Sequence, residues 1–194
     1  YAILLPSRQA LAVELRHFVE TQTSLTGASD HGVSEALYMN DPDGHGIEIY
    51  RDRAREEWPR TPNGELAMVV DPLDAPGILA AGEGSVWEGM PADTVMGHVH
   101  LHVSRLDAAI KFYIDTIGFD LIQLFGGQAA FVSAGGYHHH VGMNTWAGTG
   151  VPPAPDDRAH LVRAHPGRVV EALVEGPVHA VDVEQVAVAG GRQQ

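Results

Sequence analysis

The chain carries one pattern of secondary structure twice, and this repeat restricts the folds open to it more than any other feature. In the first copy, apolar residues 1–6 predict a strand, and residues 8–20 have apolar side chains at helical spacing. Residues 27–30 predict a turn. Strands are expected over residues 33–40 and 46–51, with a tight DPDG turn between them. The predicted order is strand, helix, strand, turn, strand.

The second copy begins with a strand over residues 97–103, followed by a helix over residues 106–116. Three more strands are predicted over residues 119–125, 129–133 and 137–146. Repeats of this size are typical of folds built from copies of one unit that cannot bury its apolar face alone. The sequence therefore predicts an α+β fold made of repeated βαβββ modules.

The ends of the two copies also align residue for residue. The stretch SAGGYHHHVG, residues 133–142, lies on DPDGHGIEIY, residues 41–50, without a gap. This alignment places His140 opposite Glu48, a carboxylate that stands between two isoleucines in a strand. Both residue types can bind metal ions, so the repeat predicts a related role for the two positions.

The repeat divides the chain into four parts. Residues 1–58 form a module whose first strand lacks its start, and residues 59–95 form a connection richer in proline and glycine. A short helix is expected in that connection over residues 76–81. Residues 96–146 form the second module, and residues 147–194 form a degenerate partial module. The chain starts without methionine inside an apparent strand, so we expect it to be truncated at its N-terminus.

Charge and composition exclude several classes of function. The net charge is -13, which argues against binding to nucleic acid or to an anionic membrane surface. No apolar run is long enough to span a membrane. Cysteine is absent, which excludes disulfides, thiolate zinc sites and cysteine nucleophiles. We expect a cytoplasmic protein.

The histidines are clustered rather than spread along the chain. His98, His100 and His102 alternate in a predicted strand and therefore point to one face of it. By the same rule, His138 and His140 share a face. A metal site with two histidines and one carboxylate requires imidazoles on one strand and a carboxylate or imidazole on another. Such a site leaves positions on the metal open for substrate and O₂.

Each of these residues also has a simpler explanation when taken alone. A triple histidine can be a solvent-facing strand end, and His98 can be a histidine bonded to backbone. Glu48 can be an edge-strand carboxylate in water, and DPDG is a common turn sequence. The joint occurrence of an aligned turn, an aligned strand and a metal-binding residue type in both copies favours the metal site.

The repeated unit resembles the βαβββ module of the vicinal oxygen chelate superfamily, which includes glyoxalases, bleomycin resistance proteins and extradiol dioxygenases. The stretch GHVHLHVSRLDAAIKFYIDTIGF is similar to the opening of that module, with His98 at the metal histidine. DPDGHGIEIY is similar to its ending, with Glu48 at the metal glutamate. The resemblance covers about residues 1–146 and implies paired modules forming cupped mixed sheets around a metal.

A narrower resemblance is to catechol 2,3-dioxygenases. A histidine–glycine pair at His31 precedes Tyr38, which lies ten residues before Glu48. The resemblance implies that His31 and Tyr38 orient the substrate by hydrogen bonds while Glu48 binds iron. The implied cofactor is a divalent metal, most simply Fe(II), with Mn(II), Zn(II) or Ni(II) as alternatives.

The resemblance also implies that the ligand set around Glu48 is incomplete in this chain. The histidine that would join Glu48 belongs just before Tyr1, and the other belongs to a module that precedes the chain. A second site would use His98, His140 and His160, where the alignment favours His140 and leaves His138 and His139 as alternatives.

The implied function is a metal-dependent extradiol dioxygenase that opens a small aromatic diol with O₂. Three alternatives are a small-molecule or drug-binding module of the resistance type, a glyoxalase-type lyase, and a metal-free remnant. A module with an unpaired sheet edge also favours association, so we expect a homo-oligomer.

Overall fold

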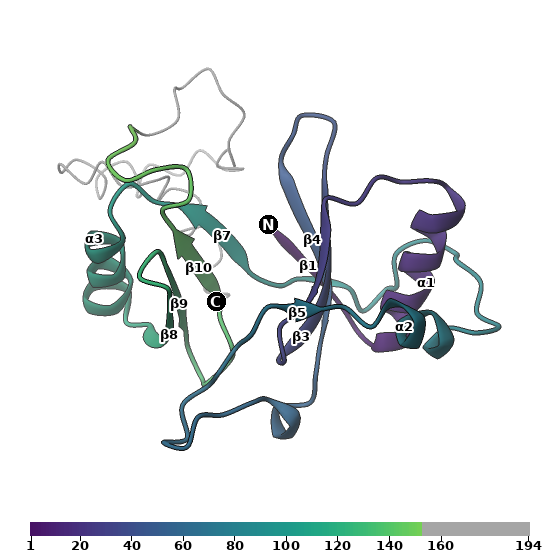
Figure 1. Cartoon of the computed structure of the whole chain (residues 1–194), viewed down its shortest axis with the longest axis horizontal. Coiled ribbons are helices and arrows are strands. Elements are labelled where there is room, and N and C mark those ends of the chain that lie inside the picture. Colours follow the sequence, from purple (N-terminus) through teal and green to yellow (C-terminus); the bar gives the residue numbers. More distant parts are fainter. Residues whose placement is uncertain (153–194) are drawn as a thin grey trace, which may run out of the picture.

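The computed structural model describes residues 1–152, which form two mixed sheets with helices packed on their outer sides (Figure 1). The larger sheet has the strand order β5-β2-β3-β4-β1-β6, and the smaller has the order β7-β10-β9-β8. The strands of the larger sheet are β1 (Ala2–Leu5), β2 (Gly27–Asp30), β3 (Ser34–Asn40), β4 (Gly46–Asp52), β5 (Asp71–Pro72) and β6 (Val95–Met96). Those of the smaller sheet are β7 (Val99–His102), β8 (Asp120–Phe125), β9 (Ala129–Ser133) and β10 (Val141–Asn144).

The two sheets repeat one arrangement. In each, the first strand of the unit runs parallel to the last: β1 pairs with β4, and β7 pairs with β10. The remaining strands of each unit pair in antiparallel fashion with their sequence neighbours. The α+β class and the repeated mixed sheets predicted from the sequence are confirmed. The boundaries of the four-part division stay a prediction.

Helix α1 (Arg8–Glu20) has the predicted bounds, and local chemistry explains them. The Ser7 side chain accepts a hydrogen bond from the backbone N–H of Ala10 and so caps the first turn. Leu11, Leu15 and Phe18 lie on one face and are buried in a cluster beneath the larger sheet. The short helix expected in the connection is α2 (Ala75–Ala81), which packs against the same cluster through Ile78.

The helix predicted over residues 106–116 is present, but it changes its winding. Helix α3 (Leu106–Lys111) continues directly into the π-helix η2 (Phe112–Ile117). Gly118 ends it with φ 89°, a left-handed conformation that glycine adopts at little cost. Tyr113 is buried with Leu101 and Met143 in the core of the smaller sheet.

Two predicted elements differ from the structure. Residues 27–30 form the strand β2 rather than a turn, because they pair with β3 on one side and β5 on the other. The strand predicted over residues 137–146 is shorter, since β10 begins only at Val141. The partial module predicted over residues 147–194 lies almost entirely outside the described residues. Within residues 1–152, no helix is long and apolar enough to cross a membrane.

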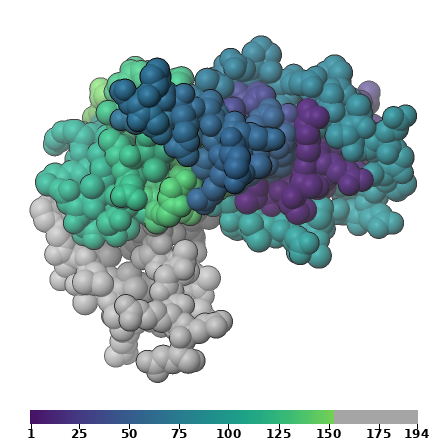
Figure 2. Space-filling model, turned by 90° about the horizontal axis from the view of Figure 1, so that it is seen from below, coloured from purple at the N-terminus to yellow at the C-terminus, as the bar shows by residue number. Residues whose placement is uncertain are grey.

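The two units are joined by backbone and by the connecting segment. The Ala2 N–H donates to the His98 carbonyl at 2.9 Å, so the strand leading into β7 continues the edge of the larger sheet. The Gln123 side chain bonds both backbone groups of Met68, at 2.8 and 3.2 Å. Figure 2 shows this connecting segment, in blue, lying across the junction of the two units. The faces of the two sheets are thereby held toward a shared space.

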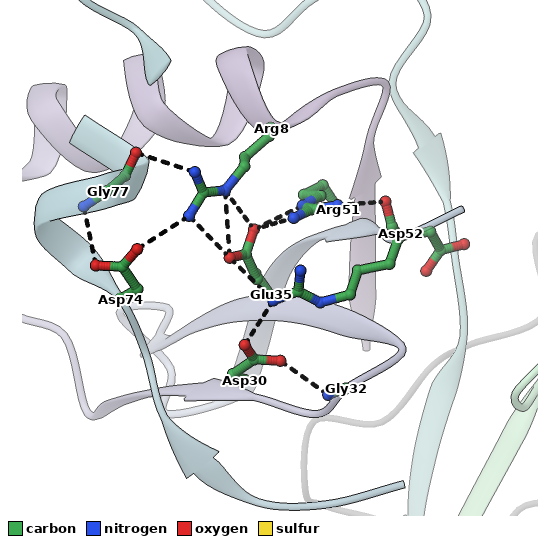
Figure 3. Close-up of polar contacts among 9 residues, drawn as sticks. Arg8, Asp30, Gly32, Glu35, Arg51, Asp52, Asp74 and Gly77 are labelled. Atoms are coloured by element: carbon green, nitrogen blue, oxygen red, sulfur yellow. Dashed lines mark hydrogen bonds and ion pairs between the residues drawn. The ribbon is translucent and has the colours of Figure 1, made fainter. Parts of the chain in front are cut away.

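A buried cluster of charges fixes the hairpin of β3 and β4 (Figure 3). The Glu35 carboxylate, 1% exposed, accepts hydrogen bonds from Arg8 at 2.9 Å, Arg51 at 2.7 Å and Arg53 at 3.3 Å. Glu35 and Arg51 are direct cross-strand neighbours, and the same register places Tyr38 opposite Glu48. We call Arg8, Glu35, Arg51 and Arg53 the arginine–glutamate cluster.

Candidate functional site

A cavity of about 530 Å³ lies between the two sheets, and both units line it. The larger sheet and its loops contribute His31, Tyr38 and Glu48, and the smaller sheet contributes His100 and His139. The remaining wall is mostly apolar and includes Val33, Ile47, Met68, Phe125, Phe131 and Trp146. An apolar cavity with a few convergent polar groups is the usual form of a small-molecule site.

Three imidazoles meet at one side of this cavity. One ring nitrogen from each of His98, His100 and His139 lies within 4.8 Å of the others, a spacing that can hold a metal ion. We call these residues the three-histidine group. His98 and His100 point to one face because successive side chains of β7 alternate, as the sequence predicts. His139 lies two residues before β10, the strand that pairs in parallel with β7.

Gly142 makes room for one of these rings. It lies opposite His100 in the pairing of β10 with β7, and a Cβ atom at this glycine would come within 2.6 Å of the His100 Nδ1. Any larger residue here would displace the ring. The close approach of His100 to the β10 backbone therefore depends on glycine at this position.

Glu48 borders the three-histidine group from the opposite sheet. Its Oε2 accepts a hydrogen bond from the His98 Nε2 at 3.0 Å and lies 3.8 Å from the His100 Nε2. Burial by itself would raise the pKa of Glu48, but the hydrogen bond and the nearby imidazoles outweigh it and lower that pKa. The carboxylate is therefore ionised and faces the histidines.

The protonation states of the three-histidine group and of Glu48 favour the binding of a cation. Burial, reinforced by the neighbouring imidazoles, lowers the pKa of His100 to about 4 and that of His139 well below its usual value. Neutral imidazoles offer lone pairs, which metal ions require. The buried Nδ1 of His98 has no hydrogen-bond partner among the described residues. Three imidazoles beside one carboxylate fit a divalent metal ion.

His31 and Tyr38 form a hydrogen-bonded pair that also faces the cavity. The His31 Nε2 lies 2.6 Å from the Tyr38 hydroxyl, and its Nδ1 lies 2.9 Å from the Val69 carbonyl oxygen. A carbonyl only accepts, so Nδ1 carries the proton and Nε2 accepts from the tyrosine. Burial, with the charge of Glu48 second, raises the pKa of Tyr38 well above its usual value, so it stays a neutral phenol.

The structure brings together four of the residues singled out from the sequence, namely His31, Tyr38, Glu48 and His98. It does not bring His140 to them. The His140 Nδ1 lies 2.9 Å from the Ser133 hydroxyl and accepts from the Ala134 N–H at 3.3 Å, and its ring stacks on Phe119. His160 lies outside the described residues.

His139 and His100 stand where the sequence reasoning expected other ligands. Alternation and the alignment of the two copies together favoured His140, but residues 137–140 precede β10 and are not in strand conformation, so alternation does not apply to them. His100 shares the face of His98, and that alternation was the signal that pointed to it. The contact of His98 with Glu48 had no sequence signal, because it joins residues of different units.

Known proteins are similar to this chain in sequence and fold. A family model for the Glyoxalase/Bleomycin resistance protein/Dioxygenase superfamily matches residues 95–185. The chain is 46% identical over 162 residues to the catechol-2,3-dioxygenase of Bacillus subtilis (strain 168), covering 83% of this chain and 56% of that protein. The chain thus spans little more than half the length of this relative.

Two solved structures are similar at lower levels. The putative dioxygenase from Bacillus subtilis subsp. subtilis str. 168 is 14% identical, with a TM-score of 0.45 over 74% of this chain and 39% of the other. The Mn(II)-bound glyoxalase from Novosphingobium aromaticivorans is 20% identical, with a TM-score of 0.27 over 74% and 40%. From the repeated βαβββ units, the matched family model and the sequence relative, the chain belongs to the glyoxalase/bleomycin resistance protein/dioxygenase superfamily.

Proposed function

We propose that the protein is a metal-dependent extradiol dioxygenase that opens a small aromatic diol with O₂. The observation that supports it most is one cavity lined by a carboxylate, two imidazoles of the three-histidine group and the His31–Tyr38 pair. In such a reaction the ring bond beside the diol breaks, and both atoms of O₂ enter the product. The name of the sequence relative agrees with this chemistry.

The ligands we propose for the metal are His98, His100 and His139, with Glu48 as the carboxylate. Fe(II) is the metal we expect, and Mn(II), Zn(II) and Ni(II) suit the same nitrogen and oxygen donors. Bound Fe(II) would hold the diol next to O₂ and supply the redox chemistry of ring opening. The protein's own residues would bind the ring against the apolar wall and accept a proton from the diol.

The His31–Tyr38 pair can remove a proton from the substrate. Since the Tyr38 hydroxyl donates to the His31 Nε2, its oxygen is left to accept a proton from a diol hydroxyl. The tyrosine proton then passes to His31, whose ring is held by the Val69 carbonyl. Tyr38 thus relays the proton as a neutral phenol, which agrees with the raised pKa of its hydroxyl.

Ring cleavage after loading with Fe(II) tests the proposal. The protein, prepared without metal and loaded with Fe(II) under anaerobic conditions, is mixed with catechol and air, and the yellow ring-cleavage product and O₂ uptake are recorded. We expect Glu48→Gln to abolish the product, whereas the exposed Glu56→Gln leaves it unchanged. Equal activity of the two variants would contradict the proposal.

Tyr38→Phe tests the proton relay separately from metal binding. Loss of a positioned acid–base group costs about 100-fold or more in rate. We expect a fall of this size in kcat while the Kd for the metal stays the same. Metal binding without O₂ uptake would instead favour a binding module, and turnover of a thiol adduct with Ni(II) or Zn(II) would favour a lyase.

A homo-oligomer remains a prediction. Its support is the exposed apolar side chains of β8, which include Leu121, Leu124 and Phe125. Light scattering after size-exclusion chromatography would measure the mass.

A further inference from the structure

Strand β4 presents three polar side chains to the second unit, at alternate positions. Glu48 accepts a hydrogen bond from His98, the Tyr50 hydroxyl lies 2.9 Å from the Tyr137 hydroxyl, and the Asp52 Oδ1 lies 2.9 Å from the His138 Nε2. Alternation along a strand explains why all three face the same way. Only the first of these contacts involves a proposed metal ligand.

The third contact begins a chain of hydrogen bonds that reaches the three-histidine group. His138 is fully buried, and its second nitrogen, Nδ1, lies 2.7 Å from the Nδ1 of His139. The other nitrogen of His139, Nε2, lies 3.3 Å from the His100 Nε2. Asp52, at the end of β4 and partly exposed, is therefore two hydrogen bonds away from the nitrogen of His139 that faces His100.

The direction of these hydrogen bonds follows from the carboxylate. Asp52 accepts only, so the His138 Nε2 must carry a proton. A neutral His138 then has a lone pair on Nδ1, and the Nδ1 of His139 must donate to it. His139 in turn has its lone pair on Nε2, the nitrogen directed at His100.

The surroundings of His138 favour the neutral ring. The groups that face it are Asp52 and the imidazoles of His98 and His139, and three aromatic rings pack beside it, those of Tyr50, Trp58 and Tyr137. A charged His138 would reverse the hydrogen bond to His139, and the measurement below detects that state.

We propose that Asp52 and His138 are positioning residues that fix the tautomer of His139 and thereby direct its Nε2 lone pair at the metal. The proposal rests on the proposed metal site. Carboxylates that orient a ligand histidine commonly change metal affinity about 10- to 100-fold. Here the carboxylate acts through an intervening imidazole, and nothing in the spacing of the sequence indicates it.

The first test uses the metal-free protein and needs no activity. Long-range ¹H–¹⁵N spectra of histidine-labelled protein distinguish a protonated from an unprotonated ring nitrogen. We expect His139 to be protonated at Nδ1 and His138 at Nε2. In Asp52→Leu, which removes the acceptor, we expect His139 to become a mixture of tautomers. A proton on Nε2 of His139, or a doubly protonated His138, in the unchanged protein would overturn the proposal.

The second test measures Co(II) affinity by competition with a chelator. We expect Asp52→Leu and His138→Phe each to weaken binding about 10- to 100-fold. Because both act through one path, the double variant should be no weaker than the single ones. Glu56→Gln removes a charge at an exposed position and should bind as the unchanged protein does. Equal Co(II) affinity of Asp52→Leu and Glu56→Gln would overturn the proposal.

The tests distinguish a failure of the positioning role of Asp52 and His138 from a failure of the proposed dioxygenase function. If Co(II) binds and depends on Asp52 but Fe(II) gives no ring cleavage, the dioxygenase assignment fails and the positioning role stands. If the tautomer of His139 is the opposite one, the positioning role fails whatever the activity. Should Asp52→Leu not fold, as judged by circular dichroism, the tautomers of the unchanged protein decide.

Discussion

The molecule buries two polar clusters of opposite design. The arginine–glutamate cluster pairs charges of both signs, with hydrogen bonds to Glu35 from three arginines. The three-histidine group instead gathers like side chains, and the buried His98 Nδ1 has no hydrogen-bond partner within the described part of the chain. A buried polar group without a partner costs free energy, so the first cluster is satisfied within the protein, whereas the second offers unpaired imidazole nitrogen to a ligand.

The largest effect is expected from removing the carboxylate at the centre of the arginine–glutamate cluster. Glu35→Leu leaves Arg8, Arg51 and Arg53 without their shared carboxylate. Breaking a buried ion pair from one side costs about 3–5 kcal/mol, and we expect the free energy of unfolding to fall by this amount. Urea unfolding of the metal-free protein measures it, with Glu56→Ala as an exposed control. A loss no larger than that of the control would show that the cluster does not hold the hairpin.

Adding a metal should complete the second cluster. A ligand that binds only the folded state stabilises it by about 2.7 kcal/mol at 100 times its Kd. We expect Co(II) or Zn(II) to raise the free energy of unfolding by this amount and a chelator to reverse the effect. In His100→Phe the gain should be much smaller at the same metal concentration. An equal gain in this variant would place the metal elsewhere.

The two clusters should also differ in their response to acid. The pKa of His100 is lowered to about 4 from an ordinary value near 6.5. Between these pH values the unfolded chain takes up a proton that the folded one does not, so stability falls as pH falls. The free energy of unfolding falls by about 1.4 kcal/mol per pH unit for each such proton.

Glu35 should make the free energy of unfolding depend on pH only at lower pH. Burial would raise its pKa, but hydrogen bonds from Arg8 and Arg51 hold it below the usual range. Its contribution is therefore present above about pH 4.5 and is lost as pH falls further. Urea unfolding of the metal-free protein from pH 7.5 to about 3 measures both ranges. In His100→Phe the free energy of unfolding should depend less on pH in the upper range. If the free energy of unfolding of the unchanged protein stayed constant down to pH 5, the prediction that the buried histidines are neutral would be contradicted.

The smallest change in stability is expected from His100→Phe itself, in the metal-free protein. The side chain is 33% exposed, and a phenyl ring keeps the contact with Gly142. A change of similar volume costs less than about 1.5 kcal/mol. Thermal unfolding measures it, and Co(II) affinity should nevertheless fall at least 10-fold. A large loss of stability would mean that the histidines serve the fold rather than a ligand.

Much of the fold could be predicted because it depends on local patterns. Helix α1 and strand β9 have the predicted bounds, since apolar spacing, the Ser7 cap and strand alternation act within a few residues. The strand β2 could not be predicted from GASD, because its only support is pairing with strands on both sides. The apolar spacing of residues 106–116 predicted a helix, but this spacing does not indicate the change to π winding.

Three features could be derived from sequence patterns: the repeated units, the strand that carries Glu48 between two isoleucines, and the shared face of His98 and His100. Each of these follows from the period of a strand or helix. The contact of Glu48 with His98 across the two units, and the place of His139 rather than His140 in the group, follow from the packing of the folded chain. The reason is physical: alternation stops where residues 137–140 leave the strand, and contacts between units depend on how whole sheets pack.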